Sequence, residues 1–212
     1  MTTPFDRSIY LASRSPRRRE LLAQFGIPFH LLMFRTRADS SPELSEDVQP
    51  GEAPGDYVLR VAREKAVSGW ARMLERRLPR APVLAADTTV ALDGRIFGKP
   101  ADRNDAEEIL TALSGKRHEV LTAVALKQGE RLETALSASQ VQFREISPQE
   151  IRDYVASGEC DDKAGAYAIQ GRAAMFVREI RGSHSGIVGL PLFETAQLLQ
   201  TLGPLNDRRN PD

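Results

Sequence analysis

The sequence of 212 residues contains a single cysteine, Cys160, so the chain cannot close a disulfide within itself. It also lacks the Cys/His spacing of a zinc site and an apolar run of about 20 residues that could span a bilayer. The segment from Met1 to Arg7 has no apolar core of the kind found in signal peptides. These absences favour a cytoplasmic protein without a membrane partner.

Charge of one sign is not in excess, because 29 basic residues balance 29 acidic ones. A protein that binds long nucleic acid through its phosphates usually carries a basic surplus, so we expect no nucleic-acid partner. The sequence also lacks a G-x-x-x-x-G-K-[ST] phosphate loop and a G-x-S-x-G nucleophile motif. Aromatic residues are only 6%, so aliphatic side chains must fill most of the core.

Apolar periodicity and turn residues predict an α/β protein. Strands are expected over 8–13, 29–34, 82–92, 118–127, 132–143 and 174–180, and helices over 16–25, 56–77, 104–113, 148–156 and 191–199. Asp93-Gly94 is typical of a hairpin turn, so part of the sheet should be antiparallel. We expect a mixed twisted sheet flanked by helices, with two lobes around a cleft, as one domain over 1–205 with a flexible tail over 206–212.

The segment from Ser13 to Arg19 joins a predicted strand to the start of a predicted helix. Ser15 and Pro16 are typical of a helix N-terminus, whose outward N–H groups favour an anion. The arginines nearby could add phosphate contacts, although they oppose the helix dipole. The alternative interpretation is a solvated basic face.

Asp87 interrupts an apolar strand, where an unpaired carboxylate is costly. It could hold Mg²⁺ or orient water, or it could cap a turn or pair with a core arginine. Lys99, between Gly98 and Pro100, could be a fixed phosphate contact or an exposed loop lysine. Lys65 lies on the apolar side of its helix, so it either snorkels to solvent or reaches into a site. Gln170 could read a base edge or satisfy backbone groups.

Taken together and in order, these segments resemble the Maf family of nucleoside triphosphate pyrophosphatases. The matching segments are LASRSPRR (11–18), RVAREKA (60–66), AADTTV (85–90), GKP (98–100), LSGKRHEVLTAV (113–124), DKAGAYAIQG (162–171) and GLP (189–191). The resemblance implies a fold related to inosine triphosphate pyrophosphatases, a homodimer, and cleavage between the α and β phosphates. It also implies a divalent cation, with Mg²⁺ expected first and Mn²⁺ or Co²⁺ as alternatives.

The resemblance further implies roles for individual residues. Asp87 matches the essential aspartate, which would also be the metal ligand. The phosphate-binding positions fall on Ser13, Arg18, Lys65, Lys99 and Lys163, and the specificity positions on Arg17, Thr88 and Gln170. The ADT and AIQG segments are similar to the subgroup that acts on dTTP and UTP rather than the one that acts on 7-methyl-GTP.

One segment departs from the family pattern. Many relatives carry a glutamate after the second strand, where this chain has Asp39. Asp39 would be the second acidic site residue, with Glu43 and Glu46 as alternatives. Three other functions stay open on the sequence: a nucleotide-binding septation regulator that acts through a protein partner, a 7-methyl-GTP pyrophosphatase, and an inosine or xanthosine triphosphate pyrophosphatase.

Overall fold

The computed structural model describes residues 8–32 and 46–202. Asp39, Glu43 and the predicted tail at 206–212 lie outside the described residues. Within the described ranges, no helix is both long enough and apolar enough to cross a membrane.

A seven-stranded mixed sheet forms the centre of the described chain, in the order β2-β1-β3-β5-β6-β7, with β4 paired to β3. The strands are β1 (Ile9–Leu11), β2 (Phe29–Leu31), β3 (Val83–Leu92), β4 (Arg95–Phe97), β5 (Arg117–Gln128), β6 (Arg131–Phe143) and β7 (Val177–Arg181). β1 runs parallel to β2 and β3, and the other pairs are antiparallel. The predicted mixed sheet is confirmed.

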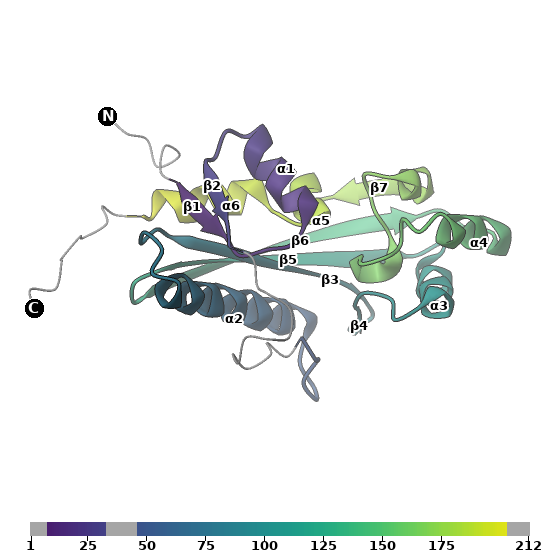
Figure 1. Ribbon diagram of the computed structural model, residues 1–212. Coiled ribbons are helices and arrows are strands. Elements are labelled where there is room, and N and C mark those ends of the chain that lie inside the picture. Colours follow the sequence, from purple (N-terminus) through teal and green to yellow (C-terminus); the bar gives the residue numbers. More distant parts are fainter. Residues whose placement is uncertain (1–7, 33–45, 203–212) are drawn as a thin grey trace, which may run out of the picture.

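Helices cover both faces of this sheet. They are α1 (Pro16–Gln24), α2 (Pro54–Glu75), α3 (Arg103–Leu113), α4 (Pro148–Ala156), α5 (His184–Val188) and α6 (Leu192–Gln200), with two 3₁₀ turns, η2 (Ala164–Ala166) and η3 (Arg172–Phe176). Figure 1 shows α2 on one face and α1, α5 and α6 on the other, with α3 and α4 at the end of the sheet away from β1 and β2. The predicted α/β architecture, a mixed sheet flanked by helices, is therefore confirmed.

The alternation of side chains along β3 divides the core into two clusters. Val83, Ala85 and Ala91 pack with the apolar face of α2, whereas Leu84 and Val90 belong to the larger cluster on the opposite face. Successive residues of a strand point to opposite faces, so neighbours in the sequence of β3 enter different environments. This division fixes where Asp87 and Thr88 point.

Local sequence signals explain most element boundaries, with a few corrections. Asp93 and Gly94 both have positive φ angles, 52° and 79°, as a tight hairpin requires. The capping box from Ser147 to Glu150 is present. The cap of α3 is Asp102 rather than the expected Asn104, because the Asp102 carboxylate accepts the N–H of Asp105.

Two further corrections concern the C-terminal part. The strand expected over 174–180 begins only at Val177, since the preceding residues form η3. The helix α5 was not predicted, because five residues are too few to show a helical period.

Candidate functional site

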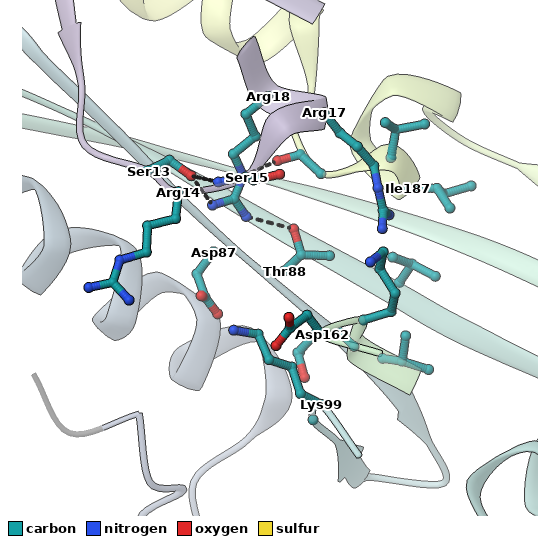
Figure 2. Close-up of a pocket in the computed structure, with 18 of the residues that line it drawn as sticks. Ser13, Arg14, Ser15, Arg17, Arg18, Asp87, Thr88, Lys99, Asp162 and Ile187 are labelled. Atoms are coloured by element: carbon teal, nitrogen blue, oxygen red, sulfur yellow. Dashed lines mark hydrogen bonds between the residues drawn. The ribbon is translucent and has the colours of Figure 1, made fainter. Parts of the chain in front are cut away.

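A cavity of about 770 Å³ opens over the middle of β3. Its walls come from the start of α1, from α2, from the β4–α3 loop, from η2 and its flanking residues, and from α5. Figure 2 shows Asp87, Lys99 and Asp162 on one side of Thr88, and Ile187 beside Arg17 on the other. The volume lies within the range of small-molecule sites, about 300–1,000 Å³.

An ion-pair triad marks the polar side of this cavity. Lys65 Nζ lies 2.7 Å from Asp87 Oδ1 and 2.7 Å from Glu46 Oε1, so one ammonium group joins two carboxylates. Burial alone would raise the pKa of Glu46, but the charge and hydrogen bond of Lys65, together with the charges of Lys99 and Arg18, make the net shift of that pKa downward. Lys65 thus reaches into the site rather than snorkelling to solvent.

Arg18 lines the cavity, and its side chain forms hydrogen bonds with several segments of the fold. Its guanidinium donates to Gly189 O at 2.7 Å, Ala86 O at 2.7 Å, Ser13 Oγ at 3.2 Å and Thr88 Oγ1 at 3.2 Å. Figure 2 shows it between Ser13 and Thr88. Burial lowers the pKa of Arg18. Four of the five N–H groups of a guanidinium are therefore committed to protein acceptors, so Arg18 ties α1, β3 and the end of α5 together.

The N-terminus of α1 opens onto the cavity. Ser15 occupies the N-cap position, but among the described residues its side chain makes no capping bond. Ser13 Oγ instead accepts the N–H of Ser15 at 3.2 Å. Arg14 and Arg17 also line the cavity, and burial lowers the pKa of Arg17. Outward N–H groups and arginine side chains make this end of the cavity suitable for an anion.

Two loops close the opposite wall. The Gly98 carbonyl accepts the N–H of Gly165 at 3.0 Å, which joins the Lys99 loop to η2. Gly165 has a φ of 69°, and a Cβ there would lie 2.6 Å from Val90. Only glycine allows this close approach. Lys163 also lines the cavity, and its ammonium donates to Asp161 O at 2.8 Å.

The part of the cavity lining next to Thr88 is apolar. Its lining includes Val90, Val120, Tyr167, Ile169, Ile187 and Val188. The side chain of Tyr167 is fixed by a buried hydrogen bond, in which its hydroxyl lies 3.0 Å from His118 Nε2. Burial raises the pKa of Tyr167 and lowers the pKa of His118 to about 4, so His118 is neutral at pH 7. This wall offers flat apolar contacts to a ligand, next to the charged wall.

The structure brings most of the sequence-predicted residues to one cavity. Those that line it are Ser13, Arg17, Arg18, Lys65, Asp87, Thr88, Lys99 and Lys163. Gln170 is exposed and is not among the described lining residues, whereas its neighbour Ile169 is. The roles assigned to these side chains stay predictions.

The sequence did not single out several lining residues. Asp162, Tyr57 and the apolar wall are examples, and Glu46 was only an alternative to Asp39. Asp162 has a positive φ of 56°, which a sequence does not reveal for an aspartate.

The cavity carries a surplus of positive charge and a small carboxylate set. Six basic residues face three acidic ones, Glu46, Asp87 and Asp162. Within residues 8–32 and 46–202, no three His, Cys, Asp or Glu side chains are grouped to hold a metal by themselves. Asp87 and Glu46, both within 2.7 Å of Lys65 Nζ, do offer the oxygen ligands that Mg²⁺ prefers. Mg²⁺ commonly uses one or two carboxylates and completes its shell with water and substrate phosphates, so the residues present fit such an ion.

Comparisons with known proteins agree with the motifs. The family model described as Maf-like protein matches residues 8–202. A protein of Nitrosomonas europaea named dTTP/UTP pyrophosphatase is 55% identical over 203 residues, which cover 96% of this chain and 98% of that protein. A protein of Aromatoleum aromaticum with the same name is 56% identical over 201 residues, covering 94% and 98%.

A solved structure of the Staphylococcus aureus Ham1 protein aligns with a TM-score of 0.39 and 18% identity, over 67% of this chain and 73% of that one. That likeness is too weak to support a conclusion. The family model and the long alignments do support one: the chain belongs to the Maf-like protein family, as its motifs indicated.

Proposed function

We propose that this protein is a nucleoside triphosphate pyrophosphatase that hydrolyses dTTP and UTP to the monophosphate and pyrophosphate, in the cytoplasm. The observation that carries the proposal is one cavity with a positively charged wall and an apolar wall. The names of the relatives from Nitrosomonas europaea and Aromatoleum aromaticum support the choice of substrates. Nucleotide-pool maintenance and division control are both compatible with this reaction.

Substrate binding uses the charge surplus of the cavity. The triphosphate lies against the N-terminus of α1 and the ammonium groups of Lys99 and Lys163, where opposite charge and N–H donors favour it. The base lies against the apolar wall, near Val90 and Ile187. Arg17, which lines the cavity beside Ile187, holds the nucleotide. Arg18 contributes mainly by fixing the backbone around the site, because its N–H groups already have protein acceptors.

Asp87 provides the base for hydrolysis. Its carboxylate, oriented by Lys65, accepts a proton from the attacking water. If the water oxygen bonds to the α phosphorus, the bond from that phosphorus to the bridging oxygen breaks and pyrophosphate leaves. If it bonds to the β phosphorus, the bond from that phosphorus to the same bridging oxygen breaks and the monophosphate leaves, so both routes give the same two products. Lys65 and Lys99 stabilise the charge that develops on the phosphate oxygens. A Mg²⁺ ion bound by Asp87, Glu46 and the phosphates would supply further charge neutralisation and a more acidic water.

The test is phosphate release from dTTP, UTP, CTP, 7-methyl-GTP, ITP and ATP, with and without added inorganic pyrophosphatase. We expect signal on dTTP and UTP that depends on the coupling enzyme. Hydrolysis in ¹⁸O-labelled water then identifies the attacked phosphorus, since the label enters the monophosphate for attack at α and pyrophosphate for attack at β.

Other outcomes would contradict the proposal in distinct ways. Signal on 7-methyl-GTP or ITP alone would keep the reaction and overturn the pyrimidine assignment. Signal without the coupling enzyme would show release of orthophosphate and overturn the pyrophosphatase reaction. Absence of hydrolysis with Mg²⁺, Mn²⁺ and Co²⁺ would favour a nucleotide-binding regulator.

A further inference from the structure

A short segment before α2, residues 46–52, brings the side chain of Glu46 into the cavity. The Glu46 carboxylate lies 2.7 Å from Lys65 Nζ, and the side chain is 48% exposed. An ion pair with a partner this exposed is weak, because water screens the charges and two long side chains lose freedom. The ion pair alone therefore does not hold Glu46 in the site, and its position depends on what fixes the backbone of the segment.

Two side chains of α2 bind this backbone at consecutive carbonyl groups. The Tyr57 hydroxyl donates to Glu46 O at 3.0 Å, and Arg60 Nη2 donates to Asp47 O at 2.9 Å. Tyr57 and Arg60 are three residues apart in the helix, so they are neighbours on its surface. The centre of the Arg60 guanidinium lies 5.6 Å from the centroid of the Tyr57 ring. One patch of α2 thus contacts both carbonyls.

The other end of the segment is fixed by the same arginine. Arg60 Nε and Nη2 donate to the two carboxylate oxygens of Glu52 at 2.7 and 2.9 Å, which is a bidentate arrangement. The hydrogen bond from Arg60 lowers the pKa of Glu52 to about 2, so this carboxylate is ionised at neutral pH. Glu52 N–H donates to Gln49 O at 3.0 Å and closes a turn. The segment is therefore a compact turn that is attached to α2 at both ends.

Tyr57 is the part of this arrangement that lies in the site itself. It lines the cavity, is 8% exposed, and packs in the core cluster between α2 and β3. Burial and the charges of Asp87 and Glu46 raise the pKa of Tyr57 to about 12, so its hydroxyl keeps its proton and can donate. A protonated hydroxyl on a packed helix is well suited to fix a backbone carbonyl in one place.

We infer that Tyr57 is a positioning residue for the proposed reaction: together with Arg60, it holds the backbone of Glu46 so that the Glu46 carboxylate stays at the Lys65 ammonium group. This inference rests on the proposed function, in which Glu46 acts together with Asp87. Because its proton is used by Glu46 O, the Tyr57 hydroxyl acts through Glu46 and not on the substrate. Its loss should therefore matter only while residue 46 carries a carboxylate.

The test compares kcat for UTP in the wild type, in Tyr57→Phe, in Glu46→Gln and in the double variant. Tyr57→Phe keeps the ring and should lower kcat about fivefold, as expected when one hydrogen bond no longer favours the productive position. Glu46→Gln should lower kcat further, and adding Tyr57→Phe to it should cause almost no additional loss. Tyr10→Phe, which removes a hydroxyl in the same core cluster but outside the described cavity lining, should leave kcat unchanged.

A second measurement follows the segment rather than the reaction. Amide hydrogen exchange in a peptide that covers residues 46–53 should be about fivefold faster in Tyr57→Phe than in the wild type, and unchanged in Tyr10→Phe. Arg60→Lys keeps the charge but cannot make the bidentate bond, so it should also lower kcat and speed this exchange. It tests the inference should Tyr57→Phe not fold.

Several results would overturn the inference. They are a folded Tyr57→Phe protein with wild-type kcat or with unchanged exchange in the segment, an equal loss of kcat in the Glu46→Gln background, and a Glu46→Gln protein with wild-type kcat. Failure of the proposed function looks different, because the wild type would then hydrolyse no nucleotide. Hydrogen exchange would still report in that case whether the Tyr57 hydroxyl holds the segment.

Discussion

Asp87 and Thr88 are consecutive residues of β3, but they face opposite sides of the sheet and have different kinds of neighbour. Asp87 forms an ion pair with the ammonium group of Lys65. The same ammonium group also pairs with Glu46, whose side chain is 48% exposed. Thr88 meets a buried network of Arg18, Thr122 and backbone carbonyls. On the proposed function, phosphates and a cation would meet the charged side, whereas the Thr88 hydroxyl on the other side is already hydrogen-bonded within the protein. On the proposed function, two adjacent residues would thus serve the reaction and the binding of the base, and each has its own hydrogen-bond and ion-pair partners.

The largest expected effect separates the reaction from binding. Asp87→Asn should lower kcat by at least ~10²-fold on both dTTP and UTP, because the amide cannot accept a proton from water. The measurement is steady-state kinetics with the melting temperature as a check of folding. Asp93→Asn, in the β3–β4 turn, is the matched control, since asparagine tolerates its positive φ. An Asp87→Asn protein that is folded and fully active would exclude the proposed role.

A second variant tests the shared ammonium of the charged side. Lys65→Gln should lower kcat by about 30-fold, because Asp87 loses its orienting partner and the phosphates lose a cation. Lys127→Gln on β5, outside the described cavity lining, should leave kcat within twofold of the wild type, as expected for a distant surface change of about 0.4 kcal/mol or less. A Lys65→Gln protein with raised KM and unchanged kcat would show that Lys65 only binds substrate.

His118, the hydrogen-bond partner of Tyr167 in the apolar wall, should make the stability of the fold sensitive to acid. Burial lowers the pKa of His118 to about 4 from the usual 6.5, so between these values the unfolded chain takes up a proton that the folded chain excludes. The stability contributed by neutral His118 is fully present above pH 6.5 and is lost as the pH falls towards 4. At pH 5.5 the loss is about 1.4 kcal/mol.

Denaturant unfolding at pH 7.5 and 5.5 measures this loss. His118→Gln should show a smaller decrease in the free energy of unfolding between the two pH values, by that amount. His30→Gln, at an exposed position, is the control. An identical pH dependence in His118→Gln and the wild type would contradict the assignment.

The smallest effect concerns the apolar wall itself. Ile187→Ala should raise KM for UTP about fivefold with little change in kcat, because the lost apolar contact serves the ground state and the transition state alike. Ile180→Ala on β7, outside the described lining, is the control. A fall in kcat as large as that of Lys65→Gln would remove the distinction between the two sides.

The sheet and the location of the site follow largely from sequence patterns. Long alternating segments made β5 and β6 predictable, and the Asp93-Gly94 turn revealed the hairpin with β4. The motif residues Asp87 and Thr88, in the middle of β3, and Lys99, in the β4–α3 loop, line one cavity. Short elements such as α5 have too few residues for a hydrophobic period to be recognised in the sequence, so they could not be predicted.

The partners of Arg18 and Thr122 were not predictable. Arg18 looks like a phosphate ligand in the sequence, whereas four of its N–H groups bond to positions from 5 to 171 residues away. Thr122 sits in a strand where threonine is common, and only the packing of α5 against β5 gives its hydroxyl an acceptor. No local pattern encodes such long-range pairs.

The bond from Arg18 to Gly189 also constrains when activity can arise during synthesis. The two residues are 171 positions apart, so almost the entire chain must have left the ribosome before the arginine can be enclosed. Contacts of such large separation form late, because the entropy of closing the intervening chain is lost before the contact is gained. A nascent or C-terminally truncated chain should therefore acquire its β5–β6 hairpin well before it acquires a working site.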